Sequence, residues 1–269
     1  MKELYSKLLT MFMTVALIFG VTAGNANAAE PNWSNNTIEA TGMGAYPARA
    51  VNQVQAKAMA RRAAIADAYR QLAEIINGVN VDAETTVENM ITTSDIVKTK
   101  VAATIRGARI ISEKEISGGY EVTMQVPLFG VSNSLADAVM PRAQTKETFP
   151  QPSVRVTSTR GSYTGLIVDC RGLGLKPVMS PVILNNAGQK IYGYKNLDPD
   201  YIIANGMANY TYSLNSGVER AGNNPLTVKA ISLESHNSYP VISSSDANMV
   251  LAENEISHFL DATNVVFVR

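Results

Sequence analysis

The chain has 269 residues, with 23 Lys and Arg against 23 Asp and Glu, one Cys and two His. Because the charges balance, the sequence offers no broad basic surface for nucleic acid or for an anionic membrane. One Cys cannot form an intramolecular disulfide, and with two His it cannot complete a zinc site of the usual Cys and His type. The length predicts one large or two small domains, each with its own core.

The N-terminus carries an export signal. Two lysines precede the apolar run over residues 8–20, and residues 26–28 (ANA) form a small-residue cleavage pattern. This predicts a secretory signal peptide over residues 1–28, cleaved near Ala28-Ala29. The apolar run is shorter than the ~20 residues that cross a bilayer, so we expect a soluble product without a transmembrane anchor. The periplasm is the expected location, and the outside of the cell is the alternative.

The mature chain opens with a polar lead-in over residues 29–47, in which only residues 37–40 resemble a strand. Residues 48–77 then hold ten Ala and no Gly or Pro, which predicts a long amphipathic helix that ends at Asn77-Gly78. Its expected apolar stripe is Val51, Val54, Ala58, Ile65, Ala68, Leu72 and Ile75. Arg61 falls within this stripe, so its guanidinium either extends to solvent or meets an acidic partner inside.

A β-hairpin is the next clear signal. Residues 108–116 and 120–127 are rich in strand formers and flank a Ser-Gly-Gly turn. One face of the second arm is apolar, which predicts that the Ala-rich helix covers it. Its members are Tyr120, Val122, Met124 and Val126. Residues 88–99 are either a short helix or a polar excursion, and residues 132–140 predict a closing helix.

Residues 141–152 (PRAQTKETFPQP) contain three Pro and no periodicity, which predicts a linker between a first domain, 48–140, and a second, 153–269. The second domain shows strand patterns at residues 163–169, 182–184, 190–194, 225–233 and 264–268, and helix patterns at 198–208 and 243–259. We therefore expect an α+β protein of two small domains, each a mainly antiparallel sheet packed with helices.

The strand over residues 163–169 leads into a candidate surface or ligand loop: Asp169, Cys170, Arg171, Gly172 and Gly174. Cys170 is either a thiolate activated by the neighbouring arginine or, more simply, a small buried hydrophobe. The loop resembles a phosphate-binding turn but lacks the third glycine, and Pro177 stands where a helix would open.

Other candidate chemistry is sparse. No Ser lies in a G-x-S-x-G elbow, and His236 and His258 lie in a polar loop and on a helix. Asp198 and Asp200, with Asn196, offer either oxygen ligands for a hard cation or a helix cap. Two alternating tyrosine pairs, at 192 and 194 and at 210 and 212, line either a binding surface or the edge of the core. We expect no catalytic residue, cofactor or metal.

Two parts of the chain resemble known families. The signal peptide, the Ala- and Arg-rich helix (QAKAMARRAAIADAYRQLAEIINGVNV) and the hairpin arm over residues 120–127 resemble the LPP-twenty lipoprotein family domain. That domain is also similar to the N-terminal region of the flagellar assembly T protein. Residues 163–169 (YTGLIVD), 171–177 (RGLGLKP) and 179–181 (MSP) resemble a module of unassigned function in exported bacterial proteins. The chain departs from the lipoprotein pattern because no Cys lies near residue 29.

The resemblance implies no catalytic residues. Together with the export signal, it favours a non-enzymatic periplasmic assembly or structural factor, with a flagellum-associated role as one form of this hypothesis. Its expected partners are envelope proteins, including a second copy of the chain. The alternative is a small-molecule or glycan-binding module, or an unrecognised hydrolase, that uses residues 163–177.

Overall fold

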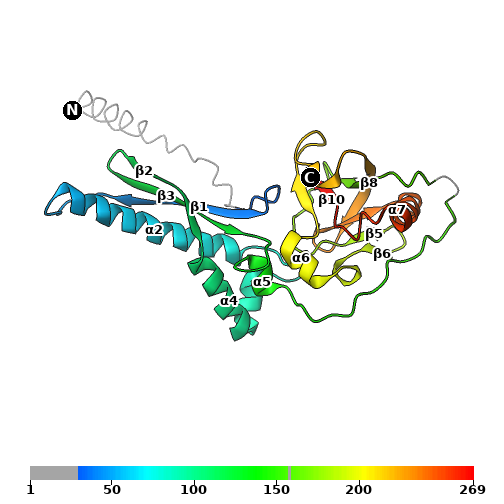
Figure 1. Ribbon diagram of the computed structural model, residues 1–269, viewed down its shortest axis with the longest axis horizontal. Helices are drawn as coiled ribbons and strands as arrows, with labels where there is room; N and C mark the ends of the chain where they lie inside the picture. Colours follow the sequence, from blue (N-terminus) through cyan, green and yellow to red (C-terminus); the bar gives the residue numbers. More distant parts are fainter. Residues whose placement is uncertain (1–29, 157–158) are drawn as a thin grey trace, which may run out of the picture.

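The computed structural model describes residues 30–156 and 159–269, so the predicted signal peptide lies outside the described residues. A three-stranded sheet and a seven-stranded sheet, each with helices, form the framework (Figure 1). The expected α+β class is therefore confirmed. No helix within the described ranges has both the length and the apolar character needed to cross a bilayer.

The first sheet is antiparallel, with strand order β1-β3-β2. β2 (Arg109–Ile116) and β3 (Gly119–Pro127) are the predicted hairpin, and Val122, Met124 and Val126 are buried as predicted. The expectation of an irregular lead-in segment is wrong, because this segment contains β1 (Thr37–Ala45). It is an edge strand of this sheet and more than twice as long as the predicted patch over residues 37–40.

The long helix α2 (Gln53–Asn77) covers one face of this sheet, as predicted (Figure 1). Its buried contact positions include Ala60, Ala64 and Ala68. The facing residues of β1 include Gly42 and Gly44, where a Cβ would lie 2.2 Å and 2.1 Å from carbonyl oxygens of the helix. The helix backbone therefore rests directly on the strand backbone, which only very small residues permit.

The predicted apolar stripe is wrong around the start of α2. Val51 and Val54 are 88% and 77% exposed, and Ala58 is exposed as well. Gly44, near the end of β1, lies against Ala60, so the helix before that point extends past the strand. Arg61 has an acidic partner, but a surface one: its Nη2 lies 2.8 Å from Glu113 Oε2 on β2, and both side chains are partly exposed.

Three shorter helices complete the first module: α3 (Val87–Thr93), α4 (Asp95–Arg106) and α5 (Leu135–Val139). The helical alternative for residues 88–99 is thus confirmed, but as two helices that share Ser94 as a cap residue. α5 is the predicted closing helix, and Ser134 caps it by accepting a hydrogen bond from the Asp137 N–H.

The second sheet has the order β6-β5-β9-β8-β4-β10-β7. Its strands are β4 (Gly165–Asp169), β5 (Ile183–Asn185), β6 (Lys190–Tyr192), β7 (Asn209–Thr211), β8 (Pro225–Glu234), β9 (Tyr239–Ile242) and β10 (Val265–Val268). The expectation of a mainly antiparallel second sheet is wrong. β4 pairs in parallel with β8 and β10, β10 with β7, and β5 with β9. All four residues of β10 are buried, which is the burial that a central parallel strand requires.

The second module contains α6 (Pro199–Asn205) and α7 (Ser244–Ser257), both predicted, and the short turns η1 (Tyr194–Asn196) and η2 (Glu219–Ala221). Asp198 caps α6 and Ser243 caps α7. Alternate residues of β10 belong to different core clusters, Val265 and Phe267 to the main core and Val266 to a second cluster beside η2. The sheet is therefore covered on both faces.

The two modules meet at a packed junction, and one apolar core contains residues of both. The Trp33 ring meets Tyr210 of β7 edge to face, with ring centroids 5.5 Å apart. Ser34 Oγ donates a hydrogen bond of 2.7 Å to the Tyr210 carbonyl, and the Met179 N–H donates one of 3.0 Å to the Asn80 carbonyl. The segment before β1 therefore ties the first module to the edge of the second sheet.

Candidate functional site

The predicted loop after β4 is a closed turn. Arg171 donates hydrogen bonds of 2.8 Å to both carboxylate oxygens of Asp169, two residues before it. The arginine also holds the pKa of Asp169 below its usual value. Gly172 and Gly174 adopt positive φ angles of 80° and 77°, and a Cβ on either would meet nothing within 4 Å. Asp169 and Arg171 neutralise each other's charge, and the two glycines allow the chain to reverse its direction.

Cys170 is buried, so the interpretation of a small hydrophobic residue is confirmed and that of an activated thiolate is wrong. Burial, together with the negative charge of Asp169, raises the pKa of the thiol from 9.0 to about 12. The chain's one thiol is therefore protonated at neutral pH and shielded from reagents.

The remaining sequence candidates make local contacts. Asp198 accepts the Tyr201 N–H at 2.8 Å, so its helix-cap interpretation is confirmed. Carboxylates lie near both histidines, Glu84 at 3.4 Å from His236 Nδ1 and Asp261 at 3.6 Å from His258 Nδ1. Within residues 30–156 and 159–269, no group of three or more His, Cys, Asp or Glu side chains could hold a metal ion.

The tyrosine pairs divide between core and surface. Tyr192 and Tyr210 are buried, and their hydroxyls donate to the carbonyls of Met207 and Val178 at 2.6 Å and 3.0 Å. Burial raises the pKa of both. Tyr194 is half-buried beside a cleft, and Tyr212 is 68% exposed. The core-edge interpretation is therefore confirmed for one member of each pair.

A polar cluster at the ends of β7 and β10 joins Tyr212 to two residues that the sequence did not single out, Arg269 and Glu30. The Arg269 guanidinium lies 4.6 Å from the centre of the Tyr212 ring, and its Nη2 donates to Glu30 Oε1 at 2.9 Å. The side chain of Arg269 is only 14% exposed. This cluster joins the start of the described chain to its last residue and adds to the module junction.

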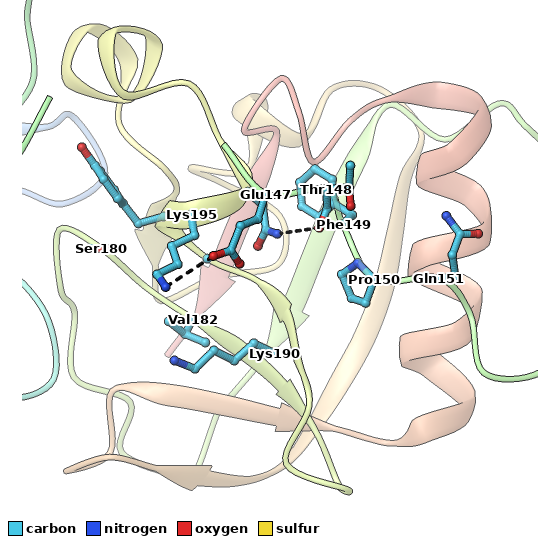
Figure 2. Close-up of a pocket in the computed structure, with 12 residues that line it drawn as sticks. Glu147, Thr148, Phe149, Pro150, Gln151, Ser180, Val182, Lys190 and Lys195 are labelled. Atoms are coloured by element: carbon cyan, nitrogen blue, oxygen red, sulfur yellow. Dashed lines mark hydrogen bonds and ion pairs between the residues drawn. The ribbon is translucent and has the colours of Figure 1, made fainter. Parts of the chain in front are cut away.

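A cleft of about 480 Å³ opens on the second module (Figure 2). One wall is the segment over residues 147–151, which has no regular secondary structure, and the other walls are residues around β5, β6 and η1. The segment is fixed in place, because Asn196 Nδ2 donates to the Thr148 carbonyl at 3.2 Å and the Glu147 N–H to the Lys195 carbonyl at 2.8 Å. The lining residues come from three separate stretches of chain: Glu147, Thr148, Phe149, Pro150, Gln151, Ser180, Val182, Lys190, Gly193, Tyr194, Lys195 and Asn196. None of residues 163–177 lines it.

The first module has a segment with several exposed apolar side chains, residues 43–59, that we call the arm. It holds four of the 13 exposed large apolar side chains of the described ranges: Met43, Val51, Val54 and Met59. The beginning of α2 lies at the end of the molecule away from the second sheet (Figure 1). Val51 and Val54, three residues apart around the start of α2, are the most exposed of the four, and large apolar side chains that lie together on a surface are typical of protein interaction sites.

Fold and surface together define a two-module α+β protein with a packed junction, a protruding arm and a cleft of about 480 Å³ on the second module. Residues 31–127 match the family model of the LPP20 lipoprotein, and residues 165–269 match that of the second domain of Treponema pallidum Tp0624. The first module thus matches an LPP20 lipoprotein domain and the second a Tp0624-type module, which supports an exported envelope protein. The resemblance to the LPP-twenty family is confirmed, whereas the similarity to the flagellar assembly T protein stays a prediction. No curated protein matches the sequence.

Proposed function

We propose that this envelope protein is a non-enzymatic periplasmic assembly or structural factor that binds other envelope proteins through the arm. The observation that supports this most strongly is the exposure of Val51 and Val54, at 88% and 77%. Burying one such side chain in an interface contributes about 1.5–3 kcal/mol, so a few of them support specific binding.

The form of α2 also supports this proposal. Ala58, Ala63 and Ala66 of its outer face are exposed. A helix that carries small apolar residues on its solvent face as well as on its core face can accept a second helix or strand at close range. The packed junction favours a second module that holds the arm in a fixed orientation.

The test is a comparison of envelope proteins that co-purify with the wild-type chain and with the double variant Val51→Asp, Val54→Asp. Both positions are exposed, so the folded state should lose less than about 0.5 kcal/mol. The variant should recover at least about tenfold less of the wild-type partners. Asn223→Asp, an exposed change on the second module, is the matched control and should behave as wild type. Equal recovery by the double variant would contradict the proposal.

A further inference from the structure

The cleft on the second module has the size and composition of a small-molecule site. Its volume of about 480 Å³ lies in the range of ~300–1,000 Å³ that ligand pockets occupy. Figure 2 shows side chains from the 147–151 segment and from the β6 side arranged around it. The question is which ligand chemistry these groups would satisfy.

The apolar part of the lining is a flat platform. One face of the Phe149 ring stacks on buried Tyr192, with an interplanar angle of 8° and centroids 6.4 Å apart. The ring also lines the cleft, next to Pro150 and Val182. Gly193 leaves space there, because a Cβ on it would meet only Val182 and Asn196, at 3.6 Å and 4.0 Å. A ligand with a flat apolar face fits this platform.

Neutral hydrogen-bonding groups surround the platform. Thr148, Ser180 and Gln151 line the cleft with hydroxyl and amide groups. Asn196 is 8% exposed, and its Nδ2 is held by the Thr148 carbonyl, whereas no described residue donates to its Oδ1. A purely apolar ligand would leave such groups without partners, which costs free energy. A sugar ring, with an apolar face and a rim of hydroxyls, satisfies both sets.

Two lysines add positive charge. Lys190 is exposed and forms no ion pair with any described residue. Lys195 Nζ lies 3.4 Å from Glu147 Oε1, and both side chains are more than half exposed, so this pair is weak and can open. No Arg lines the cleft, and Arg is the residue that most often recognises phosphate with two parallel hydrogen bonds. The charge therefore suits a single carboxylate better than a phosphate.

We propose that this cleft binds a carboxylate-bearing saccharide, with Phe149 beneath the sugar ring, Asn196 on a hydroxyl and Lys190 on the carboxylate. This proposal is independent of the contacts made by the arm. It also places ligand binding away from residues 163–177.

A matched pair of probes tests it on the folded chain. N-acetylmuramic acid and N-acetylglucosamine share the pyranose ring and acetamido group, but only the first carries a carboxylate. By NMR titration, N-acetylmuramic acid should bind at least about tenfold more tightly. Equal affinities, or no binding of either sugar at ~10 mM, would overturn the proposal.

Variants locate the binding. Lys190→Gln should remove the preference for the acidic sugar, whereas Lys176→Gln, an exposed lysine outside the cleft, should leave it unchanged. Gly193→Val should block both sugars by filling the cleft. Its backbone is extended, with φ of −179°, so the protein should keep its fold, which circular dichroism checks. Loss of affinity in the Lys176 variant, unchanged affinity in the Gly193 variant, or tighter binding of a tetraglutamate peptide would each contradict the assignment.

Discussion

The contact between β1 and α2 makes a sharp prediction for Gly42→Ala. A Cβ at this position would lie 2.2 Å from the Ala64 carbonyl oxygen and 2.2 Å from the Ala68 nitrogen. Ordinary contact begins at 3.4 Å, so the helix would have to move by about 3.4 − 2.2 = 1.2 Å. Both opposing atoms are backbone atoms of one helix, so neither can yield without moving the helix.

The expected loss follows from this geometry. Overpacking a core costs ~1–3 kcal/mol when side chains can adjust. Here the adjustment also loosens Leu72 and Ile76, which are fully buried on the same helix. We therefore expect a loss of about 3 kcal/mol or more, which is ~6–12 °C in Tm for a chain of this size.

Urea unfolding followed by far-UV circular dichroism measures this loss. Gly78→Ala is the matched control, because Gly78 has helical dihedral angles (φ −78°, ψ −5°) and a Cβ would lie 3.6 Å from its nearest neighbour. That variant should gain ~0.4–1 kcal/mol through the unfolded state. The close-packing account is refuted if Gly42→Ala lies within ~0.5 kcal/mol of wild type.

Three further predictions concern buried or half-buried groups. Cys170 should resist a thiol reagent at pH 8 until the chain is unfolded, and rapid labelling of the native protein would contradict its burial. Because the pKa of this thiol is about 12 in the folded chain and 9.0 in the unfolded chain, its contribution to stability is complete below pH 9 and is lost as the pH rises towards 12. Arg220 donates to the carbonyls of Asn205, Gly206 and Thr263, so Arg220→Lys should cost about 3 kcal/mol in urea unfolding, and an unchanged midpoint would contradict this. Buried Glu253 accepts hydrogen bonds from the N–H groups of residues 160 and 161 at 2.6 Å and 2.8 Å. Glu253→Gln should therefore speed tryptic cleavage after residue 160, and a rate equal to that of the wild type would contradict the anchoring of this segment by Glu253.

Local sequence patterns were sufficient to predict the elements that depend on residues close to one another in the chain. The Ala-rich run became α2, the glycine turn joined β2 to β3, and Asp198 and Ser243 capped their helices as predicted. These features depend on residues close in sequence, so periodicity and capping chemistry identify them.

The errors arose where tertiary contacts override local preference. β1 contains Gly42 and Gly44, which read as loop residues until the close approach of α2 explains them. β9 contains Pro240, and β7 has three residues, so neither gave a strand signal. The parallel pairing of the second sheet joins strands distant in sequence, which no local pattern encodes.

The candidate sites show the same limit. Adjacent residues suggested the loop after β4, but burial of Cys170 and the ion pair beside it could be seen only in the fold. The cleft gathers residues 147–151, 180–182 and 190–196, whose spacing carries no motif. The exposure of Val51 and Val54 depends on where β1 ends, which the helix pattern alone cannot reveal.

Site-specific crosslinking in the intact envelope tests the central proposal most directly. Within this chain, a thiol-reactive photo-crosslinker on Val54→Cys would label only the new residue, because Cys170 is buried with a raised pKa. We predict a covalent product with a second protein, or with another copy of the chain, from Val54→Cys and none from the exposed control Asn223→Cys. No product from Val54→Cys, or equal products from both positions, would contradict a binding role for the arm.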